Sequence, residues 1–212
     1  MIVSLNETTG LATKAAWGAG RPWGLAQDAG YAVSALEAMH LPGAACLLDL
    51  LLATDHIACD RLRPVSTRTE VWRGEDGLCP LLTGAYIADA HQHDLNVKLE
   101  RVYTPLLLLP FARLAASGCL LKWDETSIIA GKADVSVIGN GVSASTADIV
   151  EFTQTSGTDV AAAGITHSSQ SGPVDIDDEI WEGLSALAHR TYVPATEASR
   201  LKGAGAGLTD ND

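Results

Sequence analysis

The sequence has no long apolar run, which argues against a membrane-spanning segment. Its most conspicuous apolar cluster, residues 106–111, is far shorter than the roughly 18 residues that a spanning helix needs. The N-terminus also lacks the layout of a secretion signal, in which a charged segment precedes an apolar one. We therefore expect a cytoplasmic protein with no membrane partner.

Basic residues are scarce as well. The chain carries 14 lysines and arginines against 26 aspartates and glutamates, and its formal net charge is −12. Such a charge repels a phosphate backbone unless a local basic patch overrides it, and the sequence has no basic run longer than Arg61-Leu62-Arg63. We therefore expect no nucleic-acid partner.

The motifs that mark several enzyme and metal-binding classes are also missing. No two cysteines form a Cys-x-x-Cys pair, so the sequence predicts neither a zinc knuckle nor a redox dithiol. The glycines at 18, 20 and 24 lack the spacing of a dinucleotide fingerprint, and the serine elbow of hydrolases is absent. His91 and His93 could bind a metal from one side of a strand, but no third ligand accompanies them. We predict no metal site, and the sequence indicates no particular cofactor. The chain has four cysteines, Cys46, Cys59, Cys79 and Cys119, and we interpret most of them as buried apolar groups.

The first forty residues predict a helical hairpin. Ser4 and Glu7 have the spacing of a capping box, which favours a helix from about Leu5 to Trp17. The glycines that follow should end this helix, and Pro22 suits the first turn of a second helix that runs to about residue 39. The hairpin corner then carries two tryptophans and Arg21.

The rest of the chain predicts an α+β fold, with an N-terminal helical subdomain packed on an antiparallel sheet. Residues 44–52 indicate a third helix, whereas the chain becomes strand-like from about Val65. A late helix capped by Asp177 precedes a glycine-rich C-terminal tail. Residues 1–54 and 65–212 would be two subdomains, or parts of a single domain. The other expected elements are strands near 97–102, 135–138 and 149–153, two short strands around a polar turn within 119–129, and a buried helix over 105–116.

The two ends of the chain carry a resemblance. The corner reads Gly-Ala-Gly-x-x-Trp-Gly-Leu-Ala over residues 18–26, and the tail reads Gly-Ala-Gly-Ala-Gly-x-x-Asp-Asn-Asp over residues 203–212. Together they resemble an uncharacterised bacterial family known as a domain of unknown function. Because that family has no assigned activity, the resemblance implies no catalytic residues.

Two interpretations of the corner are open. In the first, the glycines only make a tight turn and Arg21 is solvated. In the second, the corner and the C-terminal segment together bind a small anionic metabolite, with arginines as anion clamps and an indole as one wall. This predicted site has Trp17, Arg21, Trp23, Arg190, Tyr192 and Arg200 as ligand-binding groups, and Glu197 and Asp210 as a catalytic acid or base.

Two functions follow from these interpretations. The first is a protein that binds a small anionic metabolite, with or without transforming it. The alternative is a non-catalytic subunit or adaptor that docks on a protein partner, or on another copy of itself, through its acidic tail. A solvated, frayed tail would explain the composition of the last residues without either function.

Overall fold

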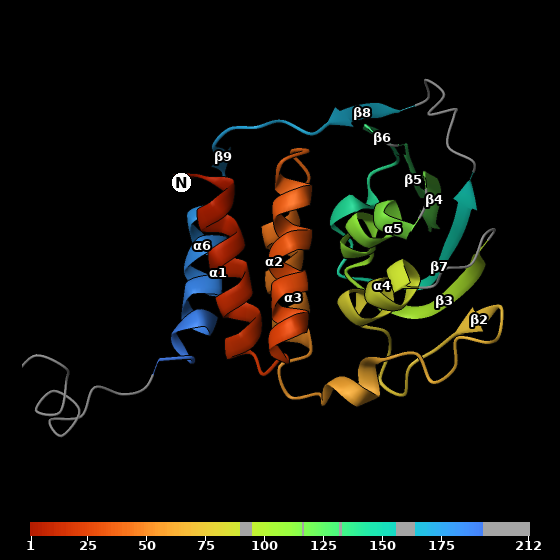
Figure 1. Cartoon of the computed structure of the whole chain (residues 1–212), viewed down its shortest axis with the longest axis horizontal. Coiled ribbons are helices and arrows are strands. Elements are labelled where there is room, and N and C mark those ends of the chain that lie inside the picture. Colours follow the sequence, from red (N-terminus) through yellow and green to blue (C-terminus); the bar gives the residue numbers. More distant parts are fainter. Residues whose placement is uncertain (90–94, 116, 132, 156–163, 193–212) are drawn as a thin grey trace, which may run out of the picture.

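The computed structural model describes residues 1–89, 95–115, 117–131, 133–155 and 164–192. Four of its helices lie side by side as a bundle, and two more lie between this bundle and a curved sheet (Figure 1). The bundle helices are α1 (Leu5–Gly18), α2 (Trp23–Glu37), α3 (Gly43–Ala53) and α6 (Asp178–His189). The intervening helices are α4 (Pro80–Asp89) and α5 (Leu109–Ala115).

The sheet has seven strands in the order β2-β3-β7-β4-β5-β6-β8. Its pairings are antiparallel except for β2, which runs parallel to β3. The strands are β2 (Val71–Trp72), β3 (Asn96–Tyr103), β4 (Gly118–Trp123), β5 (Thr126–Ala130), β6 (Asp134–Ile138), β7 (Thr146–Thr155) and β8 (Ile165–Ser168). Short 3-10 helices lie at η1 (Cys59–Leu62), η2 (Pro105–Leu108) and η3 (Gly141–Ser143).

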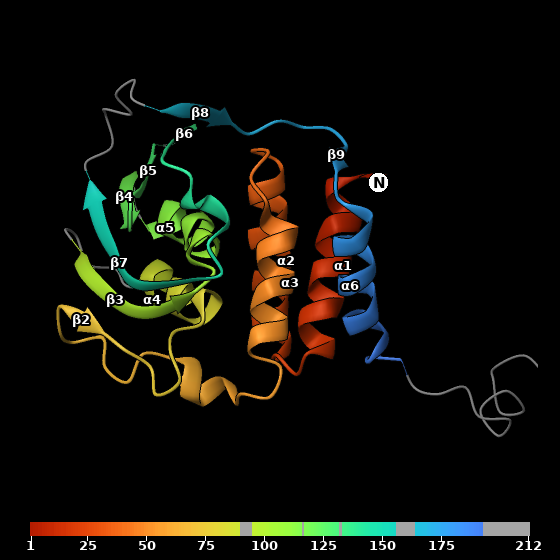
Figure 2. The same cartoon turned by 180° about the vertical axis from the view of Figure 1, so that it is seen from behind.

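A two-stranded ribbon ties the N-terminus to the start of the last helix. β1 (Ile2–Val3) pairs antiparallel with β9 (Val174–Asp175), which directly precedes α6. The N-terminal ammonium donates to Asp175 at 3.1 Å and forms an ion pair with Asp178 at 3.0 Å. As a result α6 lies alongside α1 in both views (Figures 1 and 2).

Small residues set the spacing of the bundle. The buried face of α1 consists mainly of alanine, at positions 12, 15 and 16, and these side chains are fully buried. Gly18 faces α6 so closely that a Cβ there would lie 1.9 Å from the carbonyl oxygen of Leu187. Gly30 of α2 faces the Thr13 side chain of α1 in the same way. Helix α1 can therefore contact α2 and α6 at short range.

The predicted α+β fold is confirmed, as are the capping box of Ser4 and Glu7 and the cap of the late helix by Asp177. One strand is shorter than predicted, since only Val71 and Trp72 of the segment from Val65 are in β2. This segment lies at the sheet edge and Val65 is exposed, so its β-branched side chains find no neighbouring strand to pack on.

The division into two subdomains at residues 55–64 stays a prediction. Helix α6 belongs to the second predicted subdomain, but it contacts α1 and α3 of the first. No described helix meets the length and apolarity needed to cross a bilayer.

The close contact between α1 and α6 predicts opposite effects for two substitutions in one helix. Gly18→Ala should lower the free energy of unfolding by about 1–3 kcal/mol or more, because the added methyl group meets the backbone of Leu187. Gly10→Ala should raise it by roughly 0.5–1 kcal/mol, because no atom lies near the new methyl group and alanine favours the helix. Urea unfolding followed by circular dichroism measures both. Equal effects of the two substitutions would contradict the packing.

Candidate functional site

Arg21 is buried at the end of the bundle opposite the N-terminus. The corner between α1 and α2 turns through Gly20, whose φ of 80° suits glycine, and the Arg21 N–H donates to the Ala16 carbonyl at 3.0 Å. The Arg21 side chain then points inward and is only 2% exposed. Its guanidinium donates to the Thr54 carbonyl at 3.3 Å, to the Thr54 hydroxyl and to the Cys59 Sγ at 3.3 Å. The interpretation of Arg21 as a solvated residue is therefore wrong, because Thr54 and η1 cover it.

This buried cation has no ion pair with a carboxylate in the described part of the chain. Its Nε is buried and has no hydrogen-bond partner among the described residues. Asp55, the residue after Thr54, is engaged by Arg190, with 2.5 Å between Nη1 and Oδ1. The hydrogen bond from Arg190 holds the pKa of Asp55 below its usual value, and the charge of Arg21 lowers it further.

The structure thus brings two of the predicted cations to one place. Arg21 binds Thr54 and Arg190 binds Asp55, so both guanidiniums converge on adjacent residues just after α3. Neither is an open anion clamp as it stands, since the first is buried and the second is paired. Their role in ligand binding stays a prediction.

The two predicted tryptophans contact each other on the surface. The rings of Trp17 and Trp23 meet edge to face, with centroids 5.3 Å apart and an angle of 81° between planes. Both are about half exposed. Trp23 also lines a hollow of about 490 Å³ between α1 and α2, together with Tyr31 and neutral polar side chains. Because no cation lines this hollow among the described residues, its charge does not favour an anion.

A second groove runs between α1 and α6, and we call it the α1–α6 groove. It encloses about 340 Å³, within the lower range for small-molecule sites. Its one lysine, Lys14, has no ion pair with another described residue. Tyr192 and His189 form one end, with ring centroids 5.2 Å apart. The lining residues are Glu7, Gly10, Leu11, Lys14, Trp181, Ser185, Ala188, His189 and Tyr192.

The acidic residue of this groove is already engaged. The Ser4 N–H and hydroxyl donate to the Glu7 carboxylate at 2.8 and 2.7 Å. These hydrogen bonds, led by that from the backbone, hold the pKa of Glu7 below its usual value. Glu7 is therefore an occupied acceptor in the lining of the groove, while Lys14 has no ion pair with another described residue.

The groove includes one predicted site residue, Tyr192, and others that sequence reasoning missed. Lys14 stands seven residues after Glu7, on one helical face with Gly10 and Leu11. Trp181, Ser185 and Ala188 share a face of α6 by the same spacing. Helical periodicity could have revealed each face, but only the pairing of α1 with α6 places them opposite each other.

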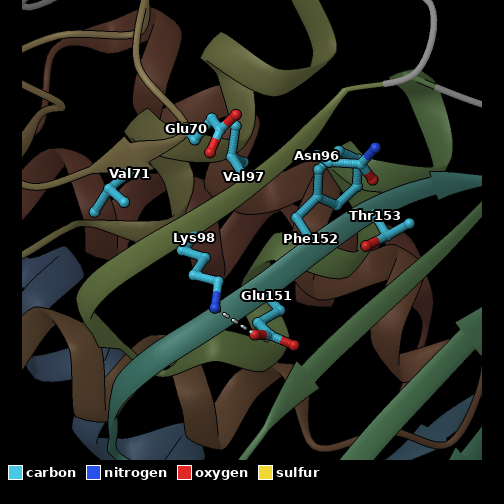
Figure 3. Close-up of a pocket in the computed structure, with 8 residues that line it drawn as sticks. All are labelled: Glu70, Val71, Asn96, Val97, Lys98, Glu151, Phe152 and Thr153. Atoms are coloured by element: carbon cyan, nitrogen blue, oxygen red, sulfur yellow. Dashed lines mark ion pairs between the residues drawn. The ribbon is translucent and has the colours of Figure 1, made fainter.

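Another hollow lies on the sheet, beside β2, β3 and β7, and measures about 480 Å³ (Figure 3). Its lysine, Lys98, is paired with Glu151 at 3.0 Å, and Glu70 adds a second carboxylate to the lining. The charge balance of this hollow disfavours an anion.

The remaining predicted residues lie outside the described part of the chain. These are Glu197, Arg200 and Asp210 of the predicted site, and His91 and His93. Among the described residues, no group of three histidine, cysteine or acidic side chains could hold a metal ion. Of the histidines in described strands, His167 of β8 accepts or donates a hydrogen bond at the Met39 carbonyl, at 2.9 Å.

Comparison with known proteins finds a family match in the first third of the chain. Residues 3–74 match a family model described as "Protein of unknown function (DUF3726)". The match covers α1, α2, α3, η1 and β2, which is about a third of the chain, and includes Arg21, Thr54 and Cys59 but not α6. No curated protein and no solved structure matches the chain. The predicted resemblance to an uncharacterised family is supported over this segment, and the tail motif lies outside it.

The pairing of Asp55 with Arg190 predicts a specific change in titration. Arg190→Gln should raise the pKa of Asp55 toward its ordinary value of 3.8, because the hydrogen bond and the charge are lost. In the natural protein the pair stabilises the fold above that ordinary pKa, and this contribution, at most about 1 kcal/mol, is lost as the pH falls through the lowered pKa. Carboxyl NMR titration measures the pKa of Asp55 in both proteins. Asp28, whose pKa is raised chiefly by burial, is the control and should not shift.

Proposed function

We propose that this protein binds a small anionic molecule with an apolar ring in the α1–α6 groove. The observation that carries the proposal is Lys14, a cation without an ionic partner among the described residues that lines a groove with aromatic walls. A carboxylate at Lys14 would gain a charge-assisted hydrogen bond, as in many metabolite sites.

The walls of the groove favour a flat, apolar body over a purely polar anion. Trp181 packs against the core, and Tyr192 and His189 face each other at one end. Two of the lining residues are small, Gly10 and Ala188, which leaves room for a ring. An aromatic carboxylate combines the charge for Lys14 with a ring for these walls.

Transformation of the ligand is a separate part of this proposal. The acid or base would be Glu197 or Asp210, which follow Tyr192 in the chain, with Arg200 as a further anion clamp. Removal of the residues after Tyr192 should then abolish turnover of a ligand while Lys14 still binds it. Equal turnover by the shortened chain would contradict a catalytic role for these residues.

The adaptor alternative is favoured by a different observation. Trp17, Trp23 and Tyr31 are 49%, 53% and 41% exposed. Trp17 and Trp23 flank the corner between α1 and α2, and Tyr31 lies about two turns further along α2. Exposed aromatic clusters of this kind are enriched where proteins bind one another. An adaptor that uses this face would need no ligand in the α1–α6 groove.

Substitution of Lys14 tests the small-molecule proposal with benzoate as the probe. In two-dimensional NMR, benzoate should shift the Trp181 indole resonance, and Lys14→Met should weaken its binding about tenfold through loss of a charge-assisted hydrogen bond. Benzamide, which has the same ring without the charge, should bind more weakly than benzoate to the natural protein.

The matched control is Lys122→Met, which removes the same charge from β4 on the sheet and should leave benzoate binding unchanged. Equal binding of benzoate and benzamide, or an equal effect of the two lysine substitutions, would contradict the proposal. Groove resonances that do not respond to benzoate would favour the adaptor alternative.

A further inference from the structure

The cluster around Arg21 carries a second chemistry that the groove does not use. We propose that Cys59 is a reactive thiol, stabilised as a thiolate by the buried guanidinium of Arg21 and oxidised by hydrogen peroxide. The Arg21 Nη1 lies 3.3 Å from the Cys59 Sγ, within hydrogen-bonding range for sulfur. This site is independent of the α1–α6 groove and of Lys14.

The first argument is the charge of Arg21. A guanidinium stays protonated in a protein, and burial of an unpaired charge costs free energy unless a counter-charge lies nearby. Apart from the Cys59 sulfur, its hydrogen bonds go to Thr54, which supplies a neutral hydroxyl and a carbonyl, and its Nε has no partner among the described residues. A thiolate at Cys59 would supply a counter-charge in direct contact with the guanidinium.

The second argument is that Asp55 does not meet this need. Its carboxylate is held by Arg190 at 2.5 Å, and its contact with Arg21 is electrostatic only. Breaking the pair with Arg190 to serve Arg21 would leave another guanidinium unpaired. Among the described residues, the Cys59 sulfur is the remaining ionisable group that Arg21 touches.

The third argument is accessibility. Cys59 is partly exposed, whereas Cys46, Cys79 and Cys119 are buried. Burial raises the pKa of Cys46 and of Cys119 to about 12, and it also raises the pKa of Cys79. Reactive cysteines combine solvent access with a neighbouring cation, and Cys59 is the described cysteine that has both.

The reaction balances without a cofactor. The Cys59 thiolate attacks one oxygen of hydrogen peroxide, an S–O bond forms and the O–O bond breaks. The sulfur is oxidised to a sulfenic acid, the peroxide is reduced, and the departing hydroxide takes a proton from solvent to become water. The guanidinium stays in place throughout and keeps its charge.

The test compares each cysteine in the folded and the unfolded full-length chain. Iodoacetamide labelling at pH 6.5, quantified for each cysteine by mass spectrometry, should be at least about tenfold faster at Cys59 in the folded protein than at Cys59 in urea. The three buried cysteines are internal controls and should react far more slowly when folded. Slower labelling of Cys59 in the folded protein would overturn the proposal.

Two further experiments separate the effect of the Arg21 charge on Cys59 reactivity from the effect of solvent exposure. Arg21→Met should lower the folded labelling rate of Cys59 about tenfold, whereas Arg21→Lys should retain part of it because it keeps the charge. If the methionine variant fails to fold, the comparison within the natural protein still decides. Peroxide followed by dimedone should place an adduct on Cys59, and fast alkylation without this adduct would overturn the oxidation step.

Discussion

The close packing of α1 between α2 and α6 is the constraint on which the rest of the structure depends. Alanines at positions 12, 15 and 16, with Gly18 and Gly30 at the contacts, let three helix backbones approach where larger side chains would hold them apart. Such packing gains dispersion energy from many short contacts but tolerates little added volume. It also places the polar face of α1 beside that of α6, which creates the α1–α6 groove.

The same packing decides the environment of the cations. Because α1 and α2 are close, the corner between them is tight, and its arginine turns inward to Thr54 and Cys59 instead of outward to solvent. Lys14, one helical turn before the corner, faces outward into the groove. Two cations seven residues apart thus have different surroundings: Arg21 is buried against Thr54 and Cys59, and Lys14 lines the groove.

Local features of the fold could be predicted from the sequence, whereas contacts between distant segments could not. The capping box of Ser4 and Glu7, the end of α1 near Gly18 and the hairpin of β4 and β5 depend on neighbouring residues, and the structure confirms them. The burial of Arg21 depends on Thr54, and the groove depends on a helix some 170 residues away. A single sequence reveals neither the contact of Arg21 with Thr54 nor that of α1 with α6, because the residue types at these contacts also occur on exposed helix faces. Helix α4 was not predicted for a related reason, since it is held by α2 and α5.

The ribbon between β1 and β9 affects how the chain folds during its synthesis on the ribosome. The first eighteen residues are made early, but the second neighbour of α1 is α6, which begins at residue 178. Until α6 is synthesised, one face of the alanine-rich hairpin has no helix to pack on. The N-terminal ammonium likewise has no contact with Asp175 and Asp178 before then. Domains ordinarily form as synthesis proceeds, but this fold is closed by one of its last described segments. Its bundle is completed only after the whole sheet has been made, so the sheet must fold beside an unfinished set of helices.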